Sequence, residues 1–198
     1  MICWCANWAA ALDGDFVECG VNSGGNARMI IEYLNSRLFH RIFFLLDTFS
    51  GFVPDLLSQR EVETVVKRYN YPDCLAKVEQ TFSEFPFVRI IPGAVPGTLE
   101  SLTTKQVAFL SIDMNCVAPE IAAANYFWPL LSPGAVVVLD DYGFSSHIQQ
   151  KLAFDQFAKE KGVDILSLPT GQGIFFKPVS AAGSPKGSET APIKPNEG

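Results

Sequence analysis

Two apolar segments that each end in aspartate constrain the fold more than any other feature of the chain. Residues 107–112 (VAFLSI) run into Asp113, and residues 136–139 (VVVL) run into Asp140 and Asp141. Near-continuous apolar runs of this length are typical of strands covered on both faces in a parallel sheet. Because ligands of such sheets bind beyond the carboxyl ends of the strands, we expect the three carboxylates to share one crevice. Their mutual repulsion suggests a bound divalent cation.

Strand patterns alternate with helix patterns, which predicts an α/β fold with helices on both faces of a mostly parallel sheet. The predicted strands cover residues 15–18, 41–46, 87–91, 107–112 and 136–139. The predicted helices cover residues 27–34, 61–69, 97–102, 119–128 and 145–161. Ile148, Leu152 and Phe157 are among the apolar positions of the last helix. Residues 163–168 and 173–177 are expected to close the fold as an antiparallel hairpin.

Composition excludes several classes of protein. A chain of 198 residues fits one domain, and its formal charge of −6 gives no electrostatic footprint for nucleic acid. No apolar stretch reaches the ~18 residues of a membrane span, and no basic residue precedes Arg28 to form a signal peptide. The five cysteines are scattered without a C-x-x-C pair, so neither disulfides nor a zinc site is indicated. We expect a reduced, cytoplasmic protein with no membrane or nucleic-acid partner.

The two ends of the chain differ from its middle. Residues 1–178 are predicted to form the single domain. Residues 179–198 contain no aromatic residue and are predicted to be a disordered tail. Residues 1–13 suggest a helix whose Trp4 and Trp8 need a partner surface. That surface is the core, missing upstream material or a second subunit, so a homo-oligomer is one expectation. Both tryptophans, with Phe127 and Trp128, are interpreted as core or interface residues rather than substrate contacts.

A glycine-rich turn follows the first predicted strand. It runs through Glu18, Cys19, Gly20, Val21, Asn22, Ser23, Gly24 and Gly25. Such glycines let the backbone approach a ligand closely, and the following helix offers its N-terminal N–H groups to a carboxylate or phosphate. Glu18 is placed to accept from an ammonium or hydroxyl group. The alternative is that the glycines only form a tight turn.

An acidic residue, Asp47, ends the second predicted strand and is followed by Thr48. Nucleoside-binding α/β folds hold ribose hydroxyls at this position, although aspartate also caps turns and helices. Phe49 and Phe52 are candidates for the lining of an adenine or substrate pocket, and a core role is the alternative. Together with the glycine turn, Asp47 predicts a nucleoside cofactor bound across the first two strands.

NAD and S-adenosylmethionine are the leading cofactor candidates. The glycines at positions 20, 24 and 25 do not have the G-x-G-x-x-G spacing of a dinucleotide site, and the chain has no Tyr-x-x-x-Lys pair. S-adenosylmethionine therefore fits better than NAD, and a nicotinamide oxidoreductase is the third hypothesis.

The chain resembles the macrocin O-methyltransferase (TylF/MycF-like) family in five segments that occur in the family's order. They are residues 14–20 (GDFVECG), 46–51 (LDTFSG), 93–99 (GAVPGTL), 112–115 (IDMN) and 139–143 (LDDYG). The resemblance extends over residues 13–178 and implies a Rossmann-like class I methyltransferase fold. It also implies S-adenosylmethionine as the cofactor and Mg²⁺-dependent methylation of a hydroxyl on a small, sugar-containing acceptor.

The resemblance also implies site residues. It makes Asp113, Asp140 and Asp141 ligands of Mg²⁺ or another divalent cation. Around the cofactor it places Glu18, Gly20, Val21, Asn22, Ser23, Gly24, Asp47, Thr48, Gly93, Ala94 and Asp113. Adjacent strand residues point to opposite faces, so Asp140 and Asp141 can converge only if the strand has already ended. The alternative is that they cap the helix that follows.

The chain departs from the family pattern after the fourth strand. The family has Asp-Gly-Asp there, with the second aspartate a candidate base, whereas this chain has Asp113, Met114 and Asn115. An amide cannot act as a carboxylate base. Water can accept the proton if metal acidification suffices, His147 can replace the base, or the protein binds the cofactor without turnover. A surface or packing role is the alternative for His147.

We therefore predict an S-adenosylmethionine-dependent, Mg²⁺-assisted O-methyltransferase acting on a sugar or glycosylated small molecule. The second hypothesis is a catalytically degenerate S-adenosylmethionine-binding protein. Acceptor specificity is expected in loops at residues 51–58 and 73–86, because loops carry most binding residues.

Overall fold

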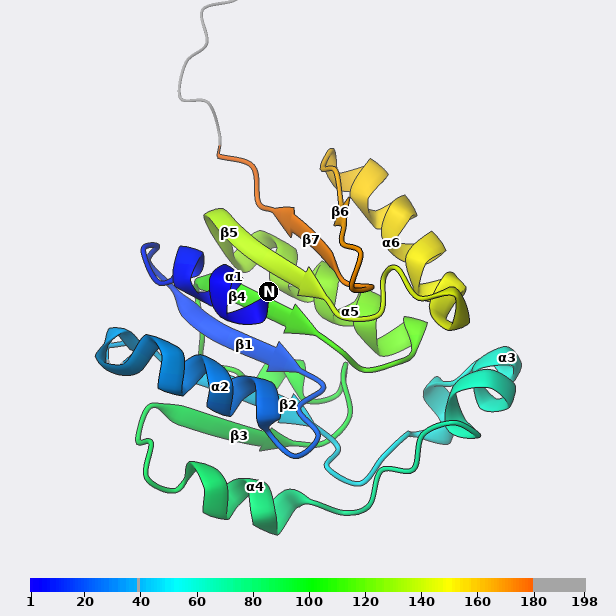
Figure 1. The fold of residues 1–198 in the computed structure, drawn as a ribbon, viewed down its shortest axis with the longest axis horizontal. Helices are drawn as coiled ribbons and strands as arrows, with labels where there is room; N and C mark the ends of the chain where they lie inside the picture. The colour runs from blue at the N-terminus through cyan, green and yellow to red at the C-terminus, as the bar shows by residue number, and fades with distance from the viewer. Residues whose placement is uncertain (39, 180–198) are drawn as a thin grey trace, which may run out of the picture.

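A computed structural model of the protein, which describes residues 1–38 and 40–179, contains a seven-stranded sheet (Figure 1). The strand order is β3-β2-β1-β4-β5-β7-β6. The strands are β1 (Asp15–Cys19), β2 (Phe43–Asp47), β3 (Val88–Pro92), β4 (Val107–Ile112), β5 (Leu131–Leu139), β6 (Leu166–Ser167) and β7 (Gly173–Phe176). The first five are parallel, and β7 pairs antiparallel with both β5 and β6. The predicted sheet and closing hairpin are confirmed.

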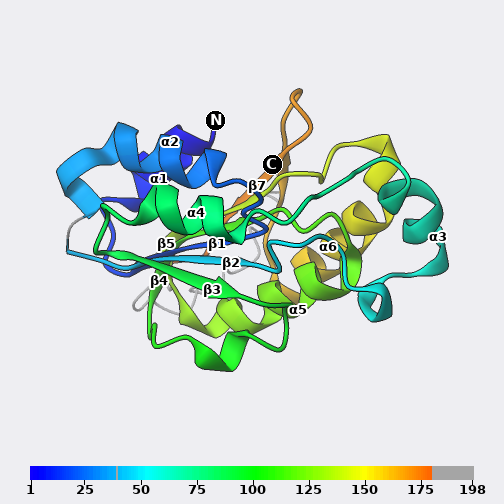
Figure 2. The same cartoon turned by 90° about the horizontal axis from the view of Figure 1, so that it is seen from below.

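Helices cover both faces of the sheet (Figure 2). One layer holds α1 (Ile2–Ala9), α2 (Gly25–Leu34) and α4 (Leu75–Phe82), and the other holds α5 (Val117–Phe127) and α6 (Ile148–Lys161). The shorter helical turns are η1 (Asn35–Leu38), η2 (Pro54–Leu56), α3 (Gln59–Glu61), η3 (Val62–Val66), η4 (Leu99–Ser101), η5 (Trp128–Leu130) and η6 (Ser145–His147). The segment with α3 and η3 projects beyond the carboxyl ends of the parallel strands (Figure 1).

Two hydrophobic cores follow from this layering, one on each face of the sheet. Along β1, Phe16 points into the core beneath α1 and α2, and Val17 points into the core beneath α5 and α6. Along β4, Phe109 and Leu110 divide in the same way, and every residue of β4 is buried. The near-continuous apolar pattern of β4 and β5 is therefore explained by burial on both faces.

Three expectations about local structure were wrong. Residues 75–82, predicted to lie in a loop, form α4, whose buried Val78 and Phe82 are four residues apart on one face. The helix predicted at residues 61–69 is the short α3 followed by the π-helical turn η3. In α6, Leu152 is 61% exposed, because Phe154 and Phe157 face the core instead.

Strand β5 begins five residues earlier than predicted. Leu131 pairs with Val107, but Val136 pairs with Phe109, so β5 has extra residues around Pro133. A bulge of this kind accommodates a proline that cannot donate to the ladder.

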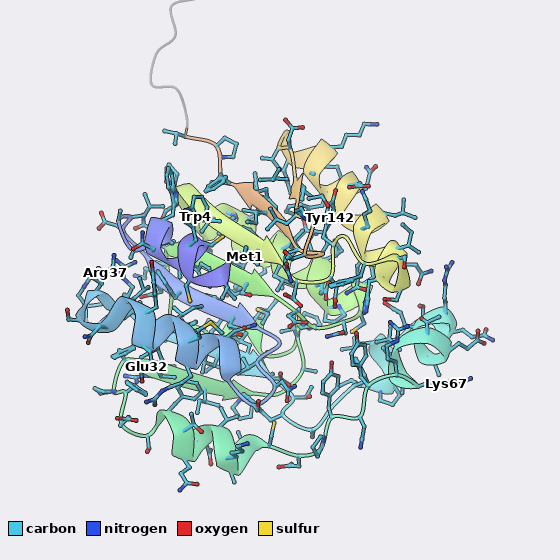
Figure 3. The ribbon with its side chains drawn as sticks, in the orientation of Figure 1. Met1, Trp4, Glu32, Arg37, Lys67 and Tyr142 are labelled. Carbon is cyan, nitrogen blue, oxygen red and sulfur yellow. The ribbon has the colours of Figure 1, made fainter. Side chains whose placement is uncertain are left out.

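The first helix packs on the core through small residues. Cys5, Ala6 and Ala9 are buried against the sheet, whereas Trp4 is 57% and Trp8 50% exposed. Figure 3 shows Trp4 on α1. A core role for Trp4 and Trp8 is therefore wrong, although Trp8 packs edge-on against Phe176, and an interface role for them stays a prediction. Phe127 is buried and Trp128 packs against the core beneath α5 and α6, as predicted.

Apart from Val179, the predicted disordered tail lies outside the described residues. All five cysteines are free. Across residues 1–38 and 40–179, none of the helices has both the length and the hydropathy needed for crossing a bilayer.

Candidate active site

A cavity of about 290 Å³ opens at the carboxyl ends of the parallel strands. Its walls come from the segments that follow β1, β2, β3 and β4. They include Gly20, Val21, Asn22, Ser23, Asp47, Thr48, Phe49, Phe52, Tyr71, Gly93, Ala94, Asp113, Met114 and Asn115. Strand β1 lies between β2 and β4, so the cavity is at the point where the strand order reverses. Open α/β sheets bind their ligands at this point.

Gly20 is required by the shape of the turn after β1. Its φ is +91°, and an added Cβ would lie 1.8 Å from the carbonyl oxygen of Asp113. Gly24, the N-cap residue of α2, has φ +84°, and its added Cβ would meet the Phe82 ring at 2.5 Å. No side chain caps the N-terminus of α2. The turn is therefore narrow and leaves main-chain donors for an anionic group.

Asp47 fastens the glycine turn to the end of β2. Its Oδ2 accepts hydrogen bonds from the backbone N–H groups of Val21 (2.6 Å) and Asn22 (2.7 Å). Its Oδ1 accepts from the N–H of Phe49 at 2.7 Å and from Thr48 Oγ1 at 3.3 Å. The carboxylate thus organises the wall of the cavity, and its contact with a ribose stays a prediction.

Glu18 is a buried carboxyl with an oxygen that has no partner. It is 1% exposed on β1, and its Oε2 makes no hydrogen bond. Burial, reinforced by Asp47, raises its pKa to about 8, although a hydrogen bond with Asn26 opposes the shift. A buried, unpartnered carboxyl oxygen is costly unless a donor reaches it. The position suits a cationic group, as the sequence predicted.

The three predicted aspartates gather at two neighbouring strand ends. Ile112 pairs with Leu139, so Asp113 and Asp140 begin adjacent turns. Strand β5 ends at Leu139, which frees Asp140 and Asp141 from the alternation of a strand. Burial, and then Asp140 and Asp141, hold the pKa of Asp113 well above its usual range. The carboxylates are close enough to repel one another.

The arrangement of these aspartates is not that of a ligand group. In the part of the chain that the structure describes, no three His, Cys, Asp or Glu side chains are placed to hold a metal ion. Asp113 Oδ1 accepts a hydrogen bond from Asn115 Nδ2 at 3.0 Å, and Asp140 Oδ1 accepts one from Gln172 Nε2 at 3.2 Å. The Oδ2 of Asp141 is buried, accepts no hydrogen bond from the described residues and lies 3.5 Å from Nδ1 of His147. The donor chemistry therefore suits a hard cation, but binding one would require these side chains to reorient.

Asn115 and His147 occupy different parts of the site. Asn115, with φ +59°, lines the cavity and holds Asp113. His147 is buried outside the cavity lining, beside Tyr69 and Asp141. A surface position for His147 is thereby excluded, and a proton-accepting role stays a prediction.

Sequence reasoning missed several residues of this region. Tyr71 lines the cavity and contacts the ring of Phe52 edge-on at 5.3 Å and the ring of Tyr69 in a stack at 5.7 Å. Glu120 and Gln150 are buried beside the aspartates. The acidic residue in the first turn of α5 was a signal for Glu120, whereas nothing in the sequence marked Gln150.

Comparison with known proteins identifies the family. The profile of the macrocin O-methyltransferase (TylF) family matches residues 5–176. The chain belongs to this family. It is 30% identical over 142 residues to the mycinamicin III 3''-O-methyltransferase of Micromonospora griseorubida, a match that covers 65% of this chain and 55% of the relative. The chain thus spans little more than half the length of that curated relative.

A second curated relative and two solved structures are also similar to the chain. A tetracenomycin-derivative 4'-O-methyltransferase of Streptomyces olivaceus is 25% identical over 184 residues, covering 88% of this chain and 69% of the relative. Among solved structures, the O-methyltransferase NovP superposes with a TM-score of 0.75 at 22% identity, over 89% of this chain and 78% of NovP. A calicheamicin methyltransferase gives a TM-score of 0.71 at 16% identity, over 88% of this chain and 76% of its own. The Rossmann-like class I methyltransferase fold is confirmed.

Proposed function

We propose that this TylF-family protein is an S-adenosylmethionine-dependent O-methyltransferase that methylates a hydroxyl of a sugar-containing small molecule. The cavity carries the proposal. It joins a narrow glycine turn and Asp113 at the switch point of the sheet. Glu18, Asp140 and Asp141 do not line the cavity, but they belong to the group of carboxyls around Asp113. The curated relatives are named as O-methyltransferases of mycinamicin III and of a rhamnosyl-bearing tetracenomycin, and the second name supports a sugar hydroxyl as the acceptor.

Residues in and next to the cavity suit this reaction in distinct ways. Glu18 would accept from the ammonium of the cofactor, which neutralises a carboxyl that burial otherwise disfavours. The glycine turn would lie along the methionine end, and Asp47 fixes its shape. Asp113 and the Tyr71 ring face the remaining space, where an acceptor hydroxyl would be oriented. Alignment of the hydroxyl with the methyl group supplies much of the catalysis in such a transfer.

A divalent cation is part of the proposal. Asp113, Asp140 and Asp141 would hold it, and the unpartnered Asp141 oxygen is the observation that supports this assignment. When bound, such an ion lowers the pKa of an acceptor hydroxyl. Because Asn115 cannot take up a proton, water is the acceptor of the proton in this scheme.

Calorimetry with S-adenosylhomocysteine, with and without Mg²⁺, tests the cofactor assignment. We expect binding in both conditions, and its absence from both would refute the proposal. Incubation with S-adenosylmethionine and mycinamicin III or TDP-rhamnose, followed by mass spectrometry, then tests methyl transfer. Loss of turnover on Mg²⁺ removal supports the cation, and unchanged turnover in excess EDTA contradicts it.

A degenerate cofactor-binding protein is the second candidate. Asn115 favours it, because an amide stands where the family has a candidate base. This alternative predicts S-adenosylhomocysteine binding with no methylated product from any acceptor in a broad sugar panel.

A further inference from the structure

A chain of buried polar side chains beside the cavity has no part in the reaction as proposed above. Glu120, Gln150 and His147 are each 3% exposed. Glu120 Oε1 accepts from Gln150 Nε2 at 2.9 Å, and Gln150 Oε1 lies 2.6 Å from His147 Nδ1. His147 Nε2 lies 3.4 Å from the hydroxyl of Tyr69. We call these four residues the Glu120 network.

The hydrogen bonds at Glu120 set the direction of the rest of the Glu120 network. Glu120 Oε1 accepts from the N–H of Met114 at 3.1 Å and from Nε2 of Gln150 at 2.9 Å. Gln150 must then direct its NH₂ group at Glu120 and its carbonyl oxygen at His147. As a result, His147 carries its proton on Nδ1, and Nε2 is free to accept from the Tyr69 hydroxyl.

The network connects the two sides of the cavity. At one end it holds Met114, next to Asp113 in the loop after β4. At the other end it holds Tyr69, whose ring stacks on the cavity-lining Tyr71 with an interplanar angle of 8°. His147 Nδ1 also lies 3.5 Å from the buried Oδ2 of Asp141.

We propose that Glu120 and Gln150 are positioning residues that act through His147. They hold the stacked pair Tyr69 and Tyr71 in a fixed position relative to Asp113 and Asp141. The inference rests on the proposed methyltransferase function. It gives His147 a fixed tautomer and a purely orienting role. Methyl transfer requires the acceptor to be aligned closely with the carboxylates. A change in the relative position of the tyrosines and the aspartates is therefore expected to weaken acceptor binding more than cofactor binding.

The sequence of the loop after β4 explains why such support is needed here. Met114 and Asn115 stand where the family has glycine and aspartate, and Asn115 adopts φ +59°. A non-glycine residue at positive φ costs free energy, which surrounding contacts must offset. The bond from Met114 N–H to Glu120 is such a contact.

The tautomer of His147 tests the proposal without any ligand. The chain has only two histidines, so long-range ¹H–¹⁵N correlation spectra at pH 8 resolve both rings, and a His40→Asn variant assigns them. We expect the Nδ1–H form for His147 in the wild type and in Glu120→Gln, whose side-chain oxygen still accepts. Gln150→Leu is expected to lose that form. The matched control is Gln149→Leu, because Gln149 is the adjacent glutamine of α6 and its side chain makes no hydrogen bond with any residue that the structure describes.

Kinetics with S-adenosylmethionine and mycinamicin III supply the functional result. In Gln150→Leu we expect the KM for the acceptor to rise about 10-fold, the usual scale for such orienting partners, with the Kd for S-adenosylhomocysteine within about twofold of Gln149→Leu. Three results would each overturn the proposal. The first is an Nε2–H tautomer of His147 in the wild type, the second is an Nδ1–H tautomer that persists in Gln150→Leu, and the third is loss of the Nδ1–H tautomer in Glu120→Gln. If Gln150→Leu does not fold, the His147 tautomer in the wild type and in Glu120→Gln still tests the proposal. A wild type without turnover bears on the proposed function alone, since the tautomer is measured without ligand.

Discussion

At the scale of single residues, the site contains groups in energetically unfavourable environments or conformations. Glu18 keeps an unpartnered oxygen in the interior, and Gly20 adopts a backbone conformation that other residues rarely reach. Such local costs are common at binding sites, where a ligand offsets them. For Glu18, stability and binding are therefore expected to change in different directions, whereas for Gly20 a substitution is expected to lower stability.

Glu18→Gln is expected to stabilise the ligand-free protein at alkaline pH while weakening binding of S-adenosylhomocysteine about 10-fold or more, since a charge-assisted hydrogen bond is lost. The folded-state pKa of about 8 lies above the unfolded value near 4.5, so the native state retains a proton over this interval. Stability then falls as pH rises from about 5 to 9, on the order of a few kcal/mol for this group. Urea unfolding at several pH values should show a shallower fall in Glu18→Gln. An unchanged slope, equal to that of the exposed control Glu79→Gln, would contradict the assignment.

Gly20→Ala should destabilise the fold by about 2 kcal/mol or more. The new methyl group would meet the Asp113 carbonyl at 1.8 Å, and φ +91° is unfavourable for alanine. Gly25→Ala is the matched control, because no atom lies within 4 Å of its added Cβ. Thermal denaturation that shows equal stability for the two variants would argue against the tight turn.

At the scale of elements, packing follows from side-chain size rather than from hydrophobicity alone. Helix α1 lies on the sheet through Cys5, Ala6 and Ala9, while its two tryptophans face outward. Periodicity predicted the helix at residues 1–13, but the large aromatic residues suggested the wrong buried face. Helix α4 was missed altogether, since its short apolar pattern lay in a segment assigned to loops.

Ala6→Leu is therefore expected to cost about 1–3 kcal/mol, because the closely packed interface has no room for a larger side chain. Trp4→Ala should change stability by no more than about 0.5 kcal/mol, as an exposed position allows. Urea unfolding of the two variants measures both effects. The reverse order of stability would show that α1 packs through its tryptophans.

At the scale of the whole molecule, four strands contribute to one cavity. The turns after β1, β2, β3 and β4 surround it, so a ligand there contacts segments that span most of the sheet. A ligand that binds only the native state stabilises it by mass action.

S-adenosylhomocysteine at 100 times its Kd should accordingly raise the free energy of unfolding by about 2.7 kcal/mol. Urea titrations with and without the ligand, monitored by tryptophan fluorescence and by circular dichroism, check the expectation. Coincident shifts of both signals support a site that joins the strands, whereas a shift of neither would contradict it.

Much of this protein followed from its sequence alone. The succession of strands and helices along the chain, the glycine turn and the aspartates at strand ends are encoded by neighbouring residues, because periodicity and turn chemistry are local properties. These features and the family resemblance were enough for the fold class. Nine of the eleven residues expected around the cofactor line the cavity, and Glu18 and Gly24 do not.

Only the tertiary structure decided how distant polar groups meet. Glu120 and Gln150 come together because α5 packs against α6, and the Tyr69 hydroxyl lies 3.4 Å from His147, which is 78 residues further along the chain. The same packing keeps Trp4 outside and leaves the three aspartates close but not arranged as ligands. Such contacts depend on the relative placement of elements far apart in the chain, which no local pattern in the sequence specifies.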